Sequence, residues 1–460
     1  MSRARSARGE EARLEVAALP MKSMDPVREK AERARAAALR LQAASNSERV
    51  RGVLAMADAL ERAAPRILAA NEEDLAEARA TGLAAPLLSR LKLTPEKLRL
   101  TLDGVRSLAR MEDPLGRTLR STLLDDGLRL YQVTVPLGVV ACVFESRPDA
   151  SIQIPALTYR SGNAALLKGG READRTNRAI VEALRAAVPE PDAVQLLEGR
   201  AEVEAVLALD ALVDLVIPRG SSEFVRHVMS RTRIPVLGHA AGVCHVYVHA
   251  SADPAKVVPL VLDAKTDNPS ACNAAETLLV DRAAAHLVRP IVEALAKAGV
   301  EVRASERARG HAAELAKPAA PEDFGAEFGD LTLALDVVDG LEEAVAFVNR
   351  HGSRHTDVIV AEDREAARRF VAAVDSAGVF VNASPRFADG YRYGLGAEVG
   401  VSTSKLHARG PVGMDGLTTT KWVLVGEGHV AGRYQGAAAK PFKHEPRPGA
   451  AWSDEFPDGR

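Results

Sequence analysis

From about residue 130 onward, the chain consists of short apolar runs that alternate with stretches of helical periodicity. Short runs bounded by turn-forming residues indicate strands, because helices are longer. Parallel strands need a crossover connection, usually a helix, so the alternation predicts a mainly parallel, doubly wound α/β sheet. The first series has apolar runs at 139–144, 164–167, 194–197, 212–217 and 246–248, with helices predicted at 175–187 and 202–209.

A second series of strands and helices begins near Thr277. The chain has 460 residues, too many for one hydrophobic core, so the two series predict two α/β domains. Residues from about 25 to 110 are rich in Ala, Leu, Glu and Arg at helical spacing, and we expect helices there. The second series has predicted strands at 278–280, 331–337, 358–360 and 379–381, and helices at 284–298, 341–350 and 366–374.

Three segments fall outside these series. Residues 119–135 are β-prone and charged, and the turn signal Asp125-Asp126-Gly127 predicts a hairpin that we interpret as an arm. Residues 1–24 are rich in Arg, Ala and Ser but also contain acidic residues and lack an apolar h-region, so we interpret them as a disordered extension. Residues 433–460 combine Pro and Gly with charges, which predicts a disordered tail.

Composition excludes several classes of protein. The 47% hydrophobic and 27% charged content is that of a globular protein, and the net charge of −2 gives no attraction to nucleic acid or an acidic membrane. No apolar stretch is long enough to span a bilayer. Three cysteines without a C-x-x-C pair predict neither a disulfide framework nor a zinc site. We therefore expect a cytoplasmic protein with no metal, nucleic-acid or membrane partner.

Cys272 differs from the other two cysteines in its neighbours. It lies in the polar, turn-forming segment 267–277, which leads directly into the apolar run 278–280. A lone cysteine is usually core packing, and Cys142 and Cys244, both in apolar surroundings, fit that interpretation. A thiol among loop formers ahead of a strand is instead placed to meet a substrate, so we predict that Cys272 is a nucleophile.

Glycine-rich nucleotide loops are absent from the sequence. There is no P-loop pattern. Two glycine clusters, at 394–400 and 426–432, have one residue too many before the third glycine and do not open a strand-to-helix turn. Neither cluster therefore predicts a dinucleotide site.

Basic and glycine residues instead follow two strands of the first series. The carboxyl ends of parallel strands are where doubly wound sheets bind ligands, and the free N–H groups of a helix start suit phosphate. Each segment by itself is better explained by solvated charges and a simple turn, but together they slightly favour a phosphate-bearing cofactor. The predicted cofactor-binding residues are Lys168, Gly169 and Arg171 after the run 164–167, and Arg219, Gly220 and Ser221 after the run 212–217.

Two further strand ends carry candidate substrate ligands. In the segment 144–149, Arg147 is suited to an anionic substrate, although a salt bridge within the loop is an equally good interpretation. The segment 381–387 offers an amide, a hydroxyl and a guanidinium within five residues, and its candidates are Asn382, Ser384 and Arg386.

The order of these segments resembles the gamma-glutamyl phosphate reductase family of the aldehyde dehydrogenase superfamily, over about residues 25–425. The nucleophile segment Ser270-Ala271-Cys272-Asn273 is the most specific part of the resemblance. Other matching segments are Pro136-Leu137-Gly138-Val139, Glu145-Ser146-Arg147-Pro148, Ile217-Pro218-Arg219-Gly220, His351-Gly352-Ser353-Arg354, Phe380-Val381-Asn382-Ala383-Ser384 and Lys405-Leu406-His407-Ala408-Arg409.

The resemblance implies an aldehyde dehydrogenase-like fold and a homo-oligomer. A Rossmann-type NADP-binding domain would comprise 25–115 and 136–248, and the catalytic domain 249–397. An oligomerisation arm would combine 116–135 with the return segment 398–432.

The resemblance also implies a nicotinamide cofactor. Relatives that prefer NAD often have a glutamate three residues after the lysine corresponding to Lys168, where this chain has Arg171. A cation there attracts a 2′-phosphate, so we expect NADP(H). Glu327 is a further cofactor-binding residue that the resemblance implies.

The implied reaction is reduction of L-glutamyl 5-phosphate by NADPH to L-glutamate 5-semialdehyde and phosphate, a step of proline biosynthesis. Cys272 would form a thioester, Asn273 would assist catalysis, and the Cys272 N–H and Ser146 side chain would stabilise the oxyanion. The upstream glutamate kinase is a possible partner. Hydrolytic relatives carry a water-activating glutamate, whereas the corresponding segment 238–242 has no carboxylate. The alternatives are an oxidising or CoA-acylating aldehyde dehydrogenase, or a catalytically silent nucleotide-binding homologue.

Overall fold

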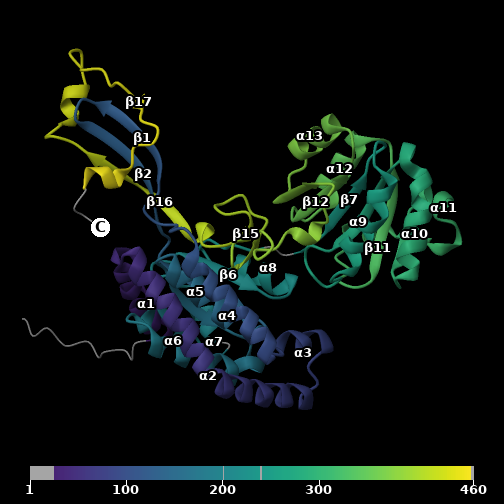
Figure 1. Ribbon diagram of the computed structural model, residues 1–460, viewed down its shortest axis with the longest axis horizontal. Helices are drawn as coiled ribbons and strands as arrows, with labels where there is room; N and C mark the ends of the chain where they lie inside the picture. Colours follow the sequence, from purple (N-terminus) through teal and green to yellow (C-terminus); the bar gives the residue numbers. More distant parts are fainter. Residues whose placement is uncertain (1–24, 200, 239–240, 457–460) are drawn as a thin grey trace, which may run out of the picture.

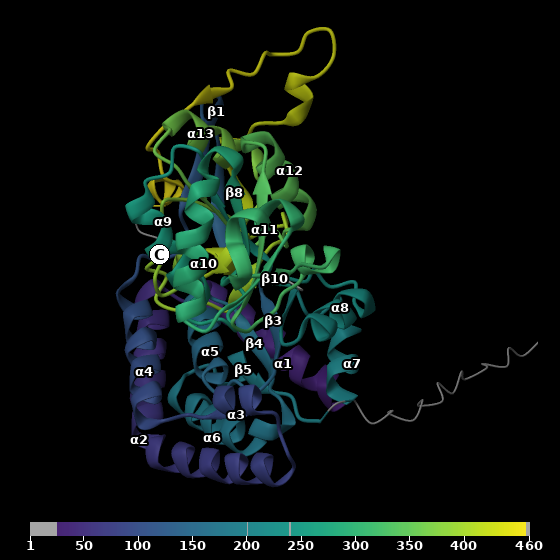
Figure 2. The same ribbon diagram turned by 90° about the vertical axis from the view of Figure 1, so that its right-hand side faces the viewer.

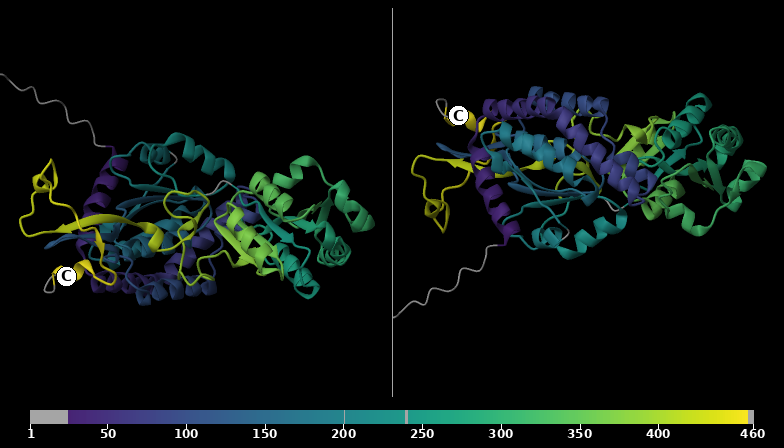
Figure 3. Two further views of the ribbon diagram at one scale, coloured as in Figure 1. Left: turned by 90° about the horizontal axis from the view of Figure 1, so that it is seen from above. Right: turned by 90° about the horizontal axis from the view of Figure 1, so that it is seen from below.

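The computed structural model describes residues 25–199, 201–238 and 241–456. These residues form two α/β lobes and a β-sheet arm, each with its own sheet (Figure 1). The arm and the second lobe lie toward opposite ends of the long axis, with most of the first lobe between them (Figure 3). The first 24 residues, interpreted above as a disordered extension, lie outside the described residues.

The first lobe is built on a four-stranded parallel sheet with the order β5-β4-β3-β6. All residues of β3 and β4 are buried, because helices cover both faces of the sheet. Cys142 lies in this core and is fully buried, which confirms its interpretation as packing. The strands are β3 (Val139–Phe144), β4 (Ala164–Lys168), β5 (Val194–Leu196) and β6 (Leu215–Arg219).

Eight helices of the described residues surround this sheet. Capping residues fix where several of them begin; for example, Ser45 and Glu48 form a capping box at the start of α2. Helices α5 and α6 pack under α2, whereas α1 packs on the strands together with α7. The helices are α1 (Pro26–Ala43), α2 (Asn46–Ala80), α3 (Ala85–Leu91), α4 (Pro95–Arg110), α5 (Ala150–Arg160), α6 (Asp174–Ala187), α7 (Ala201–Leu207) and α8 (Ser222–Arg231).

The second lobe contains a seven-stranded parallel sheet with the order β10-β9-β11-β8-β7-β12-β13. Its strands are β7 (Cys244–Val248), β8 (Ala275–Asp281), β9 (Glu301–Ala304), β10 (Lys317–Pro318), β11 (Thr332–Val338), β12 (Thr356–Val360) and β13 (Gly378–Val381). Alternate residues of β7 point to opposite faces of this sheet. Val246 and Val248 pack in the core on one face, and Tyr247 packs in the core on the other.

The helices of the second lobe cover both faces of this sheet, as a doubly wound fold requires. Figure 2 shows them above the first-lobe helices α2 to α6. They are α9 (Pro254–Thr266), α10 (Val288–Lys297), α11 (Glu306–Ala312), α12 (Leu341–His351) and α13 (Arg364–Ala373). The predicted doubly wound parallel architecture is therefore confirmed in both lobes.

The arm is a four-stranded sheet with the order β16-β2-β1-β17. Strands β1 (Thr118–Asp125) and β2 (Leu128–Pro136) form the hairpin that the sequence predicts around Gly127. Strand β16 (Thr418–Val425) pairs with β2 along its whole length. A separate two-stranded sheet of β14 (Gly400–Ser402) and β15 (Gly410–Val412) lies on the path from the second lobe to the arm.

The prediction of a disordered tail at 433–460 is wrong for residues 433–456. Strand β17 (Glu445–Pro446) pairs with β1, and two short 3₁₀ turns flank it. Polar composition signals disorder only where the charges lack partners, and here they have partners on the hairpin. Lys440 Nζ lies 2.5 Å from Asp125 Oδ2, and Glu455 accepts two hydrogen bonds from Arg129. Residues 457–460 lie outside the described residues.

Candidate active site

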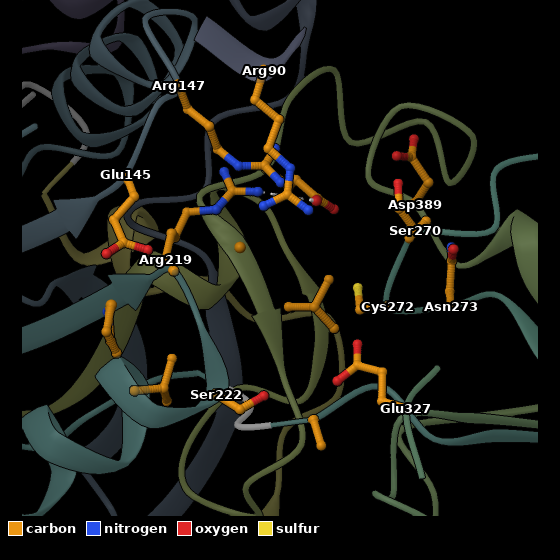
Figure 4. Close-up of a pocket in the computed structure, with 18 of the residues that line it drawn as sticks. Arg90, Glu145, Arg147, Arg219, Ser222, Ser270, Cys272, Asn273, Glu327 and Asp389 are labelled. Atoms are coloured by element: carbon orange, nitrogen blue, oxygen red, sulfur yellow. Dashed lines mark ion pairs between the residues drawn. The ribbon is translucent and has the colours of Figure 1, made fainter. Parts of the chain in front are cut away.

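A cavity of about 540 Å³ lies where the end of the first-lobe sheet faces the second lobe (Figure 4). The first lobe contributes the segments after β3 and β6 and the start of α8. The second lobe contributes the loop between α9 and β8. The cavity therefore lies at the carboxyl ends of parallel strands, where open α/β sheets bind ligands.

Cys272 is placed at this cavity by the loop between α9 and β8. Its side chain is half-buried and lines the cavity. Gly242 packs directly on this loop, since a Cβ added to Gly242 would lie 2.2 Å from the Cys272 carbonyl oxygen. The buried Cys244 thiol also lies 3.4 Å from the same oxygen. The loop is thus held from behind by backbone contact, and its thiol side is turned to the cavity (Figure 4).

Asn273 ties the nucleophile loop to a neighbouring segment. Its side-chain amide donates to the backbone oxygen of Ala388 at 2.9 Å, and that of Arg386 lies at 3.5 Å. The Asn273 Oδ1 atom is buried without a hydrogen-bond partner. An unsatisfied buried acceptor is costly, so this oxygen is available to a donor on a ligand.

Three arginines gather on one side of the cavity, opposite Cys272 (Figure 4). Arg90 comes from α3, Arg147 follows β3, and Arg219 ends β6. Burial, together with the positive charges of Arg219 and Arg90, lowers the pKa of Arg147 to about 10, against an opposing effect of Asp149. Within the described residues, this group makes one ion pair, between Arg219 and Glu398 at 3.9 Å.

Sequence reasoning identified Arg147 and Arg219 but missed Arg90. Arg90 lies on a seven-residue helix more than fifty residues before Arg147 along the chain. A single basic residue on a short helix carries no local signal of function. Only the packing of α3 against α2 brings it to the cavity.

The wall on the side of Cys272 carries mixed charges. Arg386 is buried, and its Nε lies 3.0 Å from Asp267 Oδ2. Asp389 lines the cavity and accepts hydrogen bonds from the backbone of Tyr391 and Arg392. This wall therefore combines both signs of charge, in contrast to the arginine side.

Two predicted substrate residues lie elsewhere. Asn382 does not line the cavity, and its side chain instead bonds both backbone groups of Ala361, at 2.9 and 2.8 Å. Ser384 is buried and accepts a hydrogen bond from the Arg386 backbone. In this structure both side chains form hydrogen bonds with backbone groups and so hold the segment that precedes Arg386 in place.

Three further carboxylates line the cavity, those of Glu145, Glu327 and Glu398. Glu327 is exposed and lines the cavity. The backbone N–H groups of Phe328 and Gly329, which follow it, donate to the carboxylate of Glu276. Glu276 is buried, and its Oε2 lies 2.6 Å from Lys265 Nζ. Burial raises the pKa of Glu398, whereas the charge of Arg219 lowers it. The Glu276 contacts hold the loop that presents Glu327 to the cavity.

Ser146 is placed differently from the prediction of an oxyanion donor. It is buried with a positive φ of 47°, and it does not line the cavity. Its backbone N–H and its hydroxyl both donate to Glu172 Oε1 at 2.6 Å. Here the hydroxyl serves to anchor the loop after β3.

The predicted cofactor residues fall into two groups. Gly220 lines the main cavity with Arg219, and the adjoining Ser221 caps α8 by accepting from Phe224 N. Lys168 is buried at the end of β4, and its Nζ contacts the Gly169 carbonyl. Arg171 instead lines a second cavity of about 300 Å³, beside α2.

Two kinds of site are absent from the part of the chain that the structure describes. No three His, Cys, Asp or Glu side chains group closely enough there to hold a metal ion. None of the described helices combines the length and apolar character needed to cross a membrane.

The family profile and the sequence relatives place the chain in the same family. The aldehyde dehydrogenase family profile matches residues 11–309. Gamma-glutamyl phosphate reductase 1 of Synechocystis sp. is 48% identical over 421 residues, covering 90% of this chain and 96% of the relative. The corresponding reductase of Natronomonas pharaonis is 49% identical over 423 residues, with 90% and 97% covered.

Solved structures agree with the sequence relatives. The crystal structure of gamma-glutamyl phosphate reductase from Thermotoga maritima has a TM-score of 0.85 and 38% identity, and covers 88% of this chain and all of its own. An acetylating aldehyde dehydrogenase from Geobacillus thermoglucosidasius shares the fold, with a TM-score of 0.63 at 21% identity, and covers 88% of this chain and 97% of its own. The chain therefore belongs to the gamma-glutamyl phosphate reductases, within the aldehyde dehydrogenase family.

Proposed function

We propose that this protein reduces L-glutamyl 5-phosphate to L-glutamate 5-semialdehyde and phosphate, as a step of proline biosynthesis. The names of its relatives support this reaction. The observation that carries the proposal is the position of Cys272, which lines the cavity between the lobes opposite three arginines. A nucleophile facing surplus positive charge suits an acyl donor with an anionic leaving group.

Cys272 acts as the nucleophile in this proposal. The thiolate is the reactive form of cysteine, and nearby positive charge favours it. Arg147 provides such a charge, because Cys272 and Arg147 interact electrostatically across the cavity. The thiolate attacks the acyl carbon; a C–S bond forms, the C–O bond to phosphate breaks, and the phosphate leaves with the bonding electrons.

The residues after β4 and β6 fit a nicotinamide cofactor, which the family uses. Gly220 leads into the start of α8, where Ser221 already caps one N–H and the helix start suits a pyrophosphate. When bound, the cofactor supplies the hydride that reduces the thioester. Collapse of the reduced adduct releases the aldehyde and returns the thiolate of Cys272.

We propose NADP(H) as the specific cofactor, because Arg171 is unpaired. Two arginines line the second cavity. Arg175 is paired with three carboxylates, those of Glu73, Asp74 and Glu77. Arg171 is exposed and forms no ion pair within the described residues, so its charge is available to a 2′-phosphate.

Other predicted roles remain proposals of the same kind. The Cys272 N–H would stabilise the oxyanion, and Ser146 could join it only if its hydroxyl left Glu172. Asn273 would assist catalysis by holding the nucleophile loop through its hydrogen bond to Ala388. The missing carboxylate in 238–242 supports a reaction without activated water, although residues 239 and 240 lie outside the described residues. Asn382 and Ser384 would act through the position of Arg386.

We further propose that the arm mediates homo-oligomerisation and that the protein acts in the cytoplasm, after the glutamate kinase that supplies its substrate. Trp422 and Leu424 on β16 are 54% and 57% exposed, which suits an interface between copies. We propose the predicted domain boundaries, with the cofactor domain at 25–115 and 136–248 and the catalytic domain at 249–397. One end needs correction, because β7 (Cys244–Val248), predicted as part of the cofactor domain, pairs with β8 and β12 in the second-lobe sheet. Residues 116–135 and 398–432 would form the arm and its return segment.

The reverse reaction tests the proposed function. Glutamate 5-semialdehyde should reduce NADP only when inorganic phosphate is present. Reaction with coenzyme A in place of phosphate would identify a CoA-acylating enzyme, and reaction with neither would identify a hydrolytic one. Complete inactivity with retained cofactor binding would identify a silent homologue.

A further inference from the structure

We infer that Arg90, Arg147 and Arg219 together form the site of the phosphate group that leaves the substrate, and that Arg90 is a specificity-determining residue for phosphate. The inference rests on the proposed function of the cavity. It assigns a ligand to Arg90, a residue with no local sequence signal of function, and it moves Arg219 from cofactor to phosphate binding.

The charges of the arginine group do not balance. Three guanidinium groups face one side of the cavity together with two carboxylates (Figure 4). That of Glu398 lies 3.9 Å from Arg219, and that of Glu145 accepts from Ser221 N, so the cations of this group outnumber the anions. Holding partly buried cations near one another is unfavourable unless an anion joins them. A phosphate carries close to two negative charges and several acceptor oxygens, which matches this surplus.

Geometry favours the phosphate over the substrate carboxylate as the occupant. The phosphate is bonded to the carbon that Cys272 attacks, so its site must adjoin the sulfur. Arg147 lines the same cavity across from Cys272 (Figure 4), so a phosphate held by Arg147 would lie on the side of the substrate that faces the sulfur. The carboxylate and ammonium of the substrate lie at the far end of its chain.

The mixed-charge wall suits that far end. Asp389 can accept from an ammonium, and Ser270 and Asn268 line the same region with polar side chains. Arg386 is already paired with Asp267 at 3.0 Å, so it adds a partly neutralised cation rather than surplus charge. An amino-acid group needs both signs of charge, whereas a departing phosphate needs only cations.

The chemistry of the departing group agrees with arginine ligands. When the C–O bond breaks, the electron pair moves to a phosphate oxygen, and negative charge grows there. Guanidinium groups stay protonated and donate hydrogen bonds in a fixed fork, so they stabilise this charge without transferring a proton. The phosphate therefore leaves as an anion, and the thioester stays on Cys272.

Arg90 differs from its two partners in where it comes from. Arg147 and Arg219 belong to the ends of β3 and β6, which the sheet itself positions. Arg90 reaches the cavity from α3, a helix that contacts α2 rather than the sheet. Its removal should therefore change the charge of the site while the sheet and the nucleophile loop stay in place.

The test uses the full-length chain and the reverse reaction, with inorganic phosphate as the varied substrate. Arg90→Gln should raise the KM for phosphate about 10- to 100-fold, as expected for loss of a charged hydrogen-bond donor. The KM values for glutamate 5-semialdehyde and NADP should change less than about twofold. Arg99→Gln is the matched control, because Arg99 is exposed and, among the described residues, pairs with Asp103 alone, on its own helix.

A second measurement reports phosphate binding without turnover. Iodoacetamide, which is uncharged, should alkylate Cys272 more slowly when inorganic phosphate occupies the site. In wild type this protection should be saturable, and in Arg90→Gln it should require about 10- to 100-fold more phosphate. Arg90→Lys should be intermediate, because lysine keeps the charge but lacks the planar fork. It also replaces Arg90→Gln if that variant does not fold.

Two outcomes would overturn the inference. One is an unchanged KM for phosphate with a raised KM for the aldehyde, which would place the substrate carboxylate at Arg90. The other is equal protection of Cys272 by phosphate in wild type and variant. If wild type shows no phosphate-dependent reaction at all, the proposed function fails instead, and the alkylation experiment still decides whether phosphate binds here.

Discussion

The cavity and the C-terminal tail differ in whether their charged side chains are paired. In the tail, Glu455 accepts two hydrogen bonds from Arg129 of the hairpin, at 2.6 and 2.7 Å, and Lys440 pairs with the buried Asp125 of the same hairpin. In the cavity, Arg90 and Arg147 form no ion pair within the described residues. Both regions are rich in charged residues, but the charges of the tail are paired with charges of the hairpin, whereas most of the arginine charge in the cavity is not paired within the described residues.

This difference separates structural charges from binding charges. A paired charge stabilises the position of a segment, and it offers little to a ligand. A surplus of partly buried charge of one sign is unfavourable by itself and becomes favourable when a ligand of opposite sign binds. Changes in the cavity should therefore alter activity with little effect on stability, and changes in the tail should do the reverse.

Removal of the nucleophile should have the largest effect. Cys272→Ala should lower kcat by about 10⁴- to 10⁶-fold, because the covalent route is lost. The melting temperature should stay within about 2 °C of wild type, since the side chain is only half-buried at the cavity. Kinetics and calorimetry measure the two effects, and cofactor binding should be retained.

The covalent intermediate gives an independent readout. Mass spectrometry of wild type mixed with glutamyl phosphate, without reduced cofactor, should find the glutamyl adduct on Cys272. Cys244→Ala is the matched control, because Cys244 is fully buried beside the same loop. It should keep most activity and lose about 1–2 kcal/mol of stability. An adduct on another side chain would exclude Cys272 as the nucleophile.

Loss of the unpaired arginine in the second cavity should have an intermediate effect. Arg171→Ala should lower the preference for NADP over NAD by about 10- to 100-fold, because a cation available to the 2′-phosphate is lost. Steady-state kinetics with both cofactors measure this preference. Arg175→Ala provides the comparison, since Arg175 is already paired with three carboxylates. Equal effects of the two substitutions would contradict the assignment of Arg171.

The lobes could be predicted from sequence because their signals are local. The apolar pattern gives β3 at 139–144, the range that the structure has, and it places Cys272 ahead of β8. Boundaries are harder to predict: β6 begins at Leu215 instead of 212, because Leu212 belongs to a turn and Asp214 to a bend. The apolar pattern reports burial, and burial does not fix where hydrogen bonding begins.

The contacts that the sequence could not reveal are those between distant segments. Arg90 reaches Arg147 and Arg219 only through the packing of α3. The tail is ordered through pairs such as Arg129 with Glu455, which are 326 residues apart. The hydroxyl of Ser146 points to Glu172, which follows a different strand. Such side-chain partners depend on tertiary structure, which composition and periodicity do not encode.

Deletion of the tail should affect the arm but not the chemistry. Removal of residues 433–460 would expose the β1 edge that β17 covers, so backbone amides of β1 should exchange faster with deuterium. The melting temperature should fall by a few degrees, at about 2–4 °C per kcal/mol for domains of 150–250 residues. The KM for phosphate should change less than about twofold. A large loss of activity would show that the tail also supports the cavity.

The tail should also loosen in acid, and this is the smallest effect. The Lys440 contact holds the pKa of Asp125 well below its usual range, and the Arg129 contact lowers the pKa of Glu455. Because each folded pKa lies below the unfolded one, these contacts give their full stability above about pH 5. That contribution is lost as the pH falls through the folded values.

Trp452 provides a probe of this release, because its Nε1 donates to the Gly116 carbonyl at 2.8 Å on the arm. The chain has two tryptophans, so Trp422→Phe leaves Trp452 as the only source of tryptophan emission. Its emission maximum should shift to longer wavelength below about pH 4, before the lobes unfold. Asp125→Asn, which cannot ionise, should reduce the pH dependence of that shift. An identical shift in both proteins would mean that the Asp125 pair does not hold the tail, and that Arg129 with Glu455 carries the contact.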